Sequence, residues 1–215
     1  MPRPATTDPT AEPAAPEGAD STRERIVAAA TDEFARHGIA GARVDRIAKR
    51  ARTSKERVYA YFRGKEALYG HVAAKELTEL AEATRMDPAD LPGYAGCLFD
   101  HFTARPDHHR LITWGRLELA DSAVADTGTD PTRAAIARKL DQLRQAQQAG
   151  QLDPAWDPVH VLALVNQIAT TWAAQPEMGA AAAEQAADTS TAARREAVVA
   201  AVERLFPRVK RGRAG

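Results

Sequence analysis

The stretch VDRIAKRARTSKERVYAYF occupies residues 44–62 and contains two short amphipathic segments separated by a turn. In the first segment the apolar residues follow the i, i+3, i+4, i+7 spacing of one helix face: Val44, Ile47, Ala48 and Ala51. In the second segment Val58 and Phe62 are four residues apart and therefore share a face. The sequence predicts two short helices joined by a tight turn, which are the dimensions of a helix-turn-helix.

The remaining faces of the second helix carry long donors and phenols, namely Lys55, Arg57, Tyr59 and Tyr61. The second helix of this motif lies in the major groove of DNA, where arginine pairs with guanine and tyrosine donates to phosphates. The alternative is that this base-rich stretch is only a solvated face. The two periodic helices and the tyrosines favour an interface with nucleic acid.

The neighbouring segments also read as helices. Ser21 and Glu24 form a possible capping box, and Ile26, Ala30 and Phe34 repeat every four residues before His37-Gly38. A second T-x-x-E box, Thr53 to Glu56, is expected to begin the second helix of the motif, and a further helix is expected from Lys65 to about residue 85.

Charge is concentrated in the same region. The chain has 215 residues, with 29 Lys and Arg against 29 Asp and Glu, so its formal net charge is zero. Residues 21–71 nevertheless hold twelve basic and six acidic residues. A neutral protein with one basic segment is expected to have a localised anionic partner.

Several classes of protein are excluded by composition. No run of about 18 apolar residues could span a membrane, and the N-terminus lacks the apolar stretch of a secretory signal. A single cysteine, Cys97, allows neither an intrachain disulfide nor a cysteine-based zinc site. We expect a cytoplasmic protein with a disordered, proline-rich arm at residues 1–20 and a basic flexible tail at residues 208–215.

The rest of the chain predicts helices punctuated by prolines, with no alternating strand pattern and a loop at 175–190. The expected fold is all-α, with about nine helices. The helices expected beyond residue 90 are 92–104, 106–125, 131–149, 157–174 and 191–206.

No residues with the spacing of a catalytic or metal site are found. Adjacent residues on a helix diverge by about 100°, so His108 and His109 make a poor metal pair. Phosphate-binding, metalloprotease and serine-hydrolase motifs are missing from the sequence. We therefore expect no metal, no cofactor and no enzymatic activity, with a helical enzyme as the alternative.

Residues 21–71 resemble the DNA-binding domain of the TetR family of transcriptional regulators. The resemblance rests on Ile47-Ala48, Thr53-Ser54-Lys55, Val58-Tyr59-Ala60-Tyr61-Phe62 and Lys65-Glu66-Ala67-Leu68. It implies a DNA-binding domain at 21–67 and an effector-binding and dimerisation domain at 68–207. It also implies DNA contacts from a recognition helix at 54–61 and its neighbours: Arg43, Thr53, Ser54, Lys55, Arg57, Tyr59, Tyr61 and Lys65.

Two positions depart from the pattern of the family. Ala42-Arg43 replaces the usual Thr/Ser pair, so the first helix of the motif is expected to lack a side-chain cap worth about 1 kcal/mol. Arg52 stands where Gly is usual, which predicts either a positive φ at a cost of about 1 kcal/mol or a differently shaped turn.

The resemblance further implies a homodimer, formed through helices 157–174 and 191–206, and a pocket for a small molecule. The broad apolar faces of these two helices fit an interface, although they could also bury each other within one chain. Aromatic and polar residues expected to line the pocket are Tyr94, Phe99, Phe102, Trp114, Leu117, Asn166 and Thr170. The implied protein is a repressor that an effector releases from a palindromic, double-stranded operator. A regulator or architectural protein without a ligand is the alternative.

Overall fold

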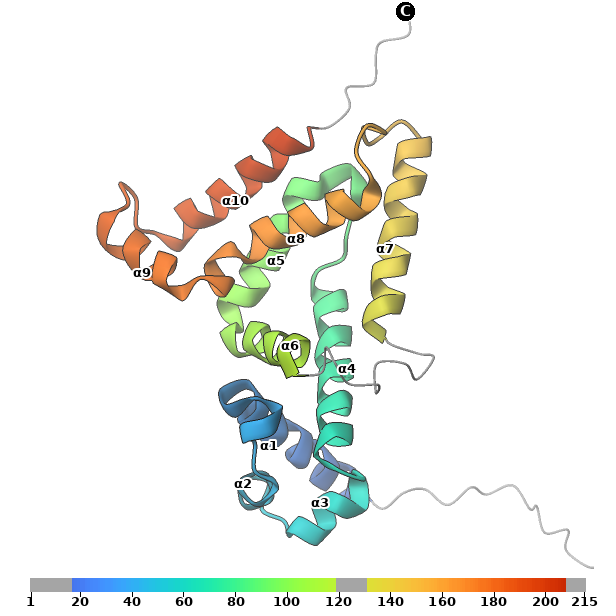
Figure 1. The fold of residues 1–215 in the computed structure, drawn as a ribbon, viewed down its shortest axis with the longest axis vertical. Helices are drawn as coiled ribbons and strands as arrows, with labels where there is room; N and C mark the ends of the chain where they lie inside the picture. Colours follow the sequence, from blue (N-terminus) through green and yellow to red (C-terminus); the bar gives the residue numbers. More distant parts are fainter. Residues whose placement is uncertain (1–16, 119–130, 208–215) are drawn as a thin grey trace, which may run out of the picture.

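The structure, a computed structural model, describes residues 17–118 and 131–207. Helices account for all of its regular structure in those ranges, so the predicted all-α fold is confirmed (Figure 1). The helices are α1 (Glu17–Gly41), α2 (Val44–Arg50), α3 (Lys55–Tyr61), α4 (Lys65–Ala83), α5 (Leu91–Ala104), α6 (Pro106–Glu118), α7 (Pro131–Gln148), α8 (Pro158–Ala174), α9 (Pro176–Gln185) and α10 (Thr191–Leu205), with a 3₁₀ turn at Pro88–Asp90. None of these helices is long and apolar enough to cross a membrane.

Helix α1 begins earlier than the sequence predicts. It starts at Glu17, so Ser21 lies inside the helix, where its hydroxyl accepts from Arg25, and the predicted capping box does not form. Once a helix is nucleated, each added residue contributes one more backbone hydrogen bond, which favours this extension. Residues 17–20, which were expected in the arm, lie within α1, and residues 1–16 lie outside the described part of the chain.

The turn between α2 and α3 has the backbone pattern that usually ends a helix at glycine. The amides of Thr53 and Arg52 donate to the carbonyls of Ala48 and Lys49, at 3.0 and 3.2 Å. Arg52 has a φ of 55°, so of the two alternatives left open for this position the structure shows the positive φ. Helix α3 is capped by Ser54, whose Oγ accepts from the Arg57 amide at 3.2 Å, and not by Thr53 as predicted.

Buried apolar side chains form two cores. The first core lies in the head, which we define as α1, α2, α3 and the N-terminal half of α4, and it includes Phe34, Ile47 and Val58. The second core lies in the body, which we define as α5, α7, α8 and α10, and it includes Leu98, Val161 and Val202. The two lie at opposite ends of the long axis in Figure 1, with α4 and α6 between them.

The C-terminal half contains one helix that the sequence analysis missed. Residues 176–185, expected within a loop, form α9, which starts with Pro176 and continues through four consecutive alanines. Proline is well suited to the first turn and alanine has the highest helix propensity. The last seven residues of the expected helix 106–125 and the expected tail 208–215 lie outside the described residues.

Candidate functional site

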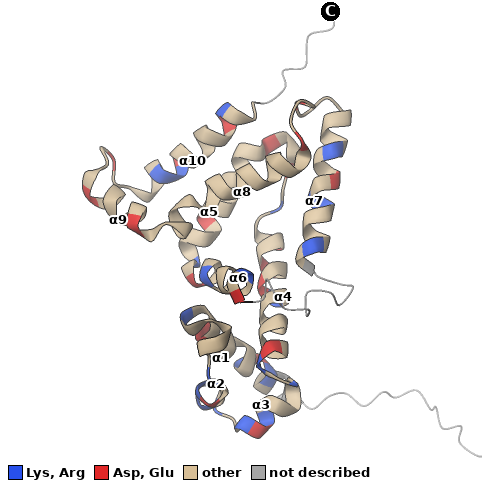
Figure 2. Ribbon diagram, in the orientation of Figure 1, with Lys and Arg blue, Asp and Glu red and all other residues tan. Residues whose placement is uncertain are grey.

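The face of α3 that looks away from the head core is polar and exposed. Val58 and Phe62 are buried, whereas Lys55, Arg57 and Tyr59 are exposed, with 45% of Tyr59 accessible to solvent. Figure 2 shows Lys and Arg on α2 and α3 at the end of the molecule opposite α10. This arrangement presents donors on a short, capped helix at the tip of the protein.

Some of the predicted contact residues are already engaged within the head. The ammonium of Lys55 lies 3.0 Å from a carboxylate oxygen of Asp45, and this hydrogen-bonded pair raises the pKa of Lys55. Thr53 is half-buried, and Tyr61 is half-buried against the head core. Lys65 begins α4, and its Nζ donates to the Ala40 carbonyl at 3.1 Å.

Five basic side chains on or directly beside α2 and α3 have no carboxylate or hydrogen-bond partner among the described residues. All of them are exposed: Arg43, Lys49, Arg52, Arg57 and Arg63. The sequence analysis did not single out Lys49 and Arg63 as contact residues. Because no internal carboxylate neutralises these five charges, they are available to an external anion.

A buried carboxylate supplies the support that the N-terminus of α2 lacks. Arg43 gives α2 no side-chain cap, as predicted, but Glu33 of α1 accepts from the Arg43 amide at 2.9 Å and from Arg46 Nε at 2.7 Å. Burial alone would raise the pKa of Glu33, yet these two donors together hold that pKa below its usual value. This contact could not be predicted from the sequence, because it joins α1 to the residue that precedes α2.

A cavity of about 720 Å³ lies between α4, α5, α6, α7 and α8. Four of the seven residues predicted for the pocket line it: Tyr94, Phe102, Asn166 and Thr170. The other three point elsewhere. Phe99 is buried in the body core, Trp114 donates from Nε1 to the Ala35 carbonyl of α1 at 3.3 Å, and Leu117 is 69% exposed.

The sequence analysis missed the basic residues of the cavity, which are Lys139, Arg116 and His109. Lys139 Nζ donates to the Tyr94 hydroxyl at 2.6 Å, and that hydroxyl donates to Asn166 Oδ1 at 3.3 Å. One signal could have revealed Lys139. Together with Ile136 it occupies the apolar stripe of its helix, since Leu140 and Leu143 follow at helical spacing.

Helix α6 contacts both the cavity and the head. His109, Ile112 and Arg116 line the cavity. On the side facing the head, Leu111 belongs to the head core. Two hydrogen bonds fix the α6 backbone and side chains there: Tyr69 OH to the Leu111 carbonyl at 2.9 Å, and the Ala40 amide to Glu118 Oε2 at 2.6 Å. A molecule in the cavity that displaced α6 would therefore also move α1.

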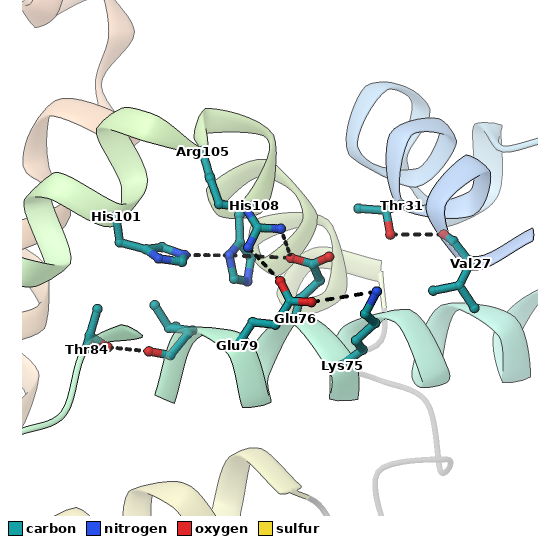
Figure 3. Close-up of polar contacts among 10 residues, drawn as sticks. Val27, Thr31, Lys75, Glu76, Glu79, Thr84, His101, Arg105 and His108 are labelled. Atoms are coloured by element: carbon teal, nitrogen blue, oxygen red, sulfur yellow. Dashed lines mark hydrogen bonds and ion pairs between the residues drawn. The ribbon is translucent and has the colours of Figure 1, made fainter. Parts of the chain in front are cut away.

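A separate polar cluster lies where α4, α5 and α6 meet (Figure 3). Arg105 donates to Glu76 at 2.8 Å and to Glu79 at 2.7 Å, while His101 Nε2 lies 2.7 Å from His108 Nδ1. No group of three or more ligating side chains suited to a metal ion occurs in the described ranges. The cluster ties the three helices together.

Comparison with known proteins agrees with this architecture. Residues 26–72 match the bacterial regulatory proteins of the tetR family, and residues 90–204 match a tetracyclin repressor-like C-terminal domain. The chain is 35% identical over 159 residues to the HTH-type transcriptional repressor SCO4008 of Streptomyces coelicolor, covering 74% of this chain and 82% of that protein. It is 26% identical over 140 residues to the HTH-type transcriptional repressor NicS of Pseudomonas putida, covering 62% and 65% of the two chains.

A solved structure is more similar still. The crystal structure of SCO4942 from Streptomyces coelicolor shares 73% identity, covers 87% of this chain and 99% of its own, and superposes with a TM-score of 0.80. The exposed, capped α3 and these matches define a helix-turn-helix, DNA-binding transcriptional regulator and not an enzyme. The chain belongs to the tetR family.

Proposed function

We propose that the protein is a homodimeric repressor that binds a palindromic operator through α3 and leaves it when a small molecule occupies the cavity. The observation that carries this proposal is that α6 contacts both the cavity and the head. One side of α6 lines the cavity, and the other is bonded to the head through Leu111 and Glu118. The repressors SCO4008 and NicS support the direction of regulation.

On DNA, α3 lies in the major groove. Arg57, which is exposed and has no partner within the described chain, contacts a base edge, and Lys55 exchanges Asp45 for a second base contact. Other residues on and around the helix contact phosphates and fix its register: Arg43, Thr53, Ser54, Tyr59, Tyr61 and Lys65. Two heads reach half-sites about 34–36 Å apart, or a multiple of that spacing.

The dimer forms through α8 and α10, which lie against each other in the body. Each helix leaves large apolar side chains in solvent, with Leu164 37% and Leu205 41% exposed in the isolated chain. Pairing these two helices with the same two of a second copy gives a four-helix bundle, which covers both side chains.

The effector acts through α4 and α6. The proposed division into a DNA-binding domain at 21–67 and an effector domain at 68–207 is bridged by α4, because Leu68, Tyr69 and Val72 are part of the head core. A molecule in the cavity favours an arrangement of α4 and α6 in which the two heads no longer match the operator. Coupling of this kind is typically worth about 1–3 kcal/mol.

Selection of bound duplexes from a random pool by the full chain, at stated salt, tests the proposal. A palindrome is expected. On that palindrome, Arg57→Ala is expected to cost about 1–3 kcal/mol and to relax preference at one base position, whereas Lys65→Ala weakens all sequences alike and lowers the salt slope by about one. Arg144→Ala, on the exposed face of α7, is the control and leaves binding unchanged. Binding that neither Arg57→Ala nor Lys65→Ala alters contradicts the docking of α3.

A further inference from the structure

The lining of the cavity contains basic but no acidic side chains among the described residues. The basic residues are Lys139, Arg116 and His109. The remaining surface is largely aliphatic and aromatic, with Leu77, Leu98 and Ile112 among its members. A cavity that combines an apolar wall with unopposed positive charge complements a molecule with an apolar body and a negative group.

The Lys139 ammonium is the best defined of these charges. It is half-buried, its Nζ donates to Tyr94 OH at 2.6 Å, and it lies 4.9 Å from the centre of the Tyr94 ring. Tyr94 is itself almost fully buried, and its hydroxyl is directed at Asn166. The ammonium is therefore held in one place by a neutral hydroxyl and an aromatic ring.

No carboxylate in the described residues neutralises Lys139. Burial, with a smaller contribution from the charge of Arg138, holds the pKa of Lys139 below its ordinary value. Withdrawing an ammonium from water without a counterion costs free energy, and an anion brought by a ligand recovers much of that cost. Burial raises the pKa of Tyr94 to about 12, so its hydroxyl stays protonated beside the ammonium.

We propose that the cavity binds an amphipathic organic anion, with a carboxylate or sulfonate on Lys139 Nζ and an apolar body along α4, α5 and α6. Tyr94 and Asn166 position the ammonium, and Lys139 selects anions over neutral or cationic molecules of the same shape. The inference rests on the proposed function for its regulatory consequence, because only an effector-responsive repressor would convert this binding into release of DNA.

Two fluorescent probes that share a ring system test the charge preference directly. 1-Anilinonaphthalene-8-sulfonate carries a sulfonate, and N-phenyl-1-naphthylamine has the same rings without it. In titrations of the full chain, Lys139→Met is expected to weaken binding of the sulfonate probe by roughly 10- to 100-fold and to leave the affinity for the neutral probe nearly unchanged. Lys75→Met, the same substitution at an exposed position of α4 outside the cavity, is the control and changes neither affinity.

Competition then tests the ligand class. Decanoate is expected to displace the sulfonate probe, while decan-1-ol and decyltrimethylammonium displace it poorly. Tyr94→Phe, which keeps the ring and removes the hydroxyl, is expected to weaken binding of decanoate by a smaller factor than Lys139→Met does. This variant replaces Lys139→Met in the test if Lys139→Met fails to fold. Equal displacement by the alcohol, sulfonate binding that Lys139→Met and Tyr94→Phe leave unchanged, or no binding of either anion overturns the inference.

Operator release separates this inference from the proposed function. If decanoate binds through Lys139 but the operator complex persists, the ligand class is correct and the effector mechanism is wrong. If neutral molecules release the operator and anions do not, the effector mechanism is correct and the ligand class is wrong.

Discussion

Arginines in and beside α2 and α3 that look alike in the sequence differ in whether a carboxylate of the head pairs with them. Arg46 pairs with Glu33 and Arg50 pairs with Asp32, so both charges are used to join α2 to α1. Arg43 and Arg57 have no such partner in the described part of the chain. The head thus separates cations that stabilise its fold from cations left for a phosphate or a base, and only the second group is expected to set the salt dependence of DNA binding.

The buried His108 makes the stability of the protein sensitive to acid. His108 is 2% exposed, and burial, with the charges of His101 and Arg105, lowers its pKa from 6.5 to about 4. As the pH falls, the unfolded chain therefore takes up this proton before the folded protein does. The contribution of His108 to the free energy of unfolding is present above pH 6.5 and is lost toward pH 4. It amounts to something on the order of 3 kcal/mol.

Urea unfolding at pH values between 8 and 4 measures this slope. His108→Gln, which keeps a polar group near His101, is expected to flatten it, while His160→Gln at an exposed position of α8 leaves it unchanged. Burial also lowers the pKa of His101 and His109, so both lower the stability of the protein as the pH falls. It raises the pKa of Glu76, which has the opposite effect on stability. The difference in pH slope of the free energy of unfolding between wild type and His108→Gln is due to His108. Equal slopes for the two proteins would refute the role of His108 in acid sensitivity.

Single residues also show which structural features can be predicted from the sequence and which cannot. Val58 and Phe62 could be assigned to the core because their spacing alone places them on one face of a short helix. Lys139 could not be placed in the cavity, since its surroundings come from Tyr94 and Asn166 on two other helices. Trp114 was expected in the pocket because it is aromatic, but only the packing of α6 on α1 decides which way it points.

At the scale of elements, the junction between α1 and α6 depends on Gly38. Its φ of 67° and ψ of −176° are almost exclusive to glycine. A Cβ there would also meet the Glu118 side chain and lie 3.0 Å from Trp114 Cε3. Gly38→Ala is expected to lower the free energy of unfolding by about 1–3 kcal/mol, measured by urea denaturation.

Gly70 gives the matched comparison for Gly38. It lies inside α4, and a Cβ there would meet no atom within 4 Å, so Gly70→Ala is expected to raise the stability by up to about 1 kcal/mol. Opposite signs for the two Gly→Ala changes support the junction. A Gly38→Ala protein as stable as wild type would mean that α6 does not hold the head as described.

Most helices could be predicted because prolines and capping residues mark their ends. Helices α5, α8 and α10 start within one residue of the predicted positions, and each is capped by an Asp or Ser side chain. Helix α9 was missed because it has no apolar stripe and buries no residue, so only its alanine content could have indicated it. A pocket was expected from the family resemblance and four of its seven predicted residues line the cavity, but its basic residues and its position were not predicted, since they are set only where α4 to α8 come together.

At the scale of the whole molecule, the two cores belong to two separately packed units, the head and the body, and a conformational switch requires two such units. Each core is internally packed, and α4 and α6 are the elements that connect them across the length of the protein (Figure 1). A ligand that binds one arrangement of these helices more tightly than another shifts the population toward it by that difference in affinity. In a dimer, a small change in the tilt of α4 and α6 is applied to both heads and alters the distance between them.

The final prediction concerns the dimer. Leu164→Glu and Leu205→Glu place a charge on the exposed faces of α8 and α10, where an apolar interface would have to desolvate it. Sedimentation equilibrium at micromolar concentration is expected to show dimers for the wild type and monomers for the double variant. The variant is also expected to bind a full palindrome no better than a single half-site. Leu117→Glu, on α6 and more exposed than either leucine, is the control and remains dimeric. A double variant that stays dimeric would place the interface elsewhere and leave the spacing of the two α3 helices without its proposed cause.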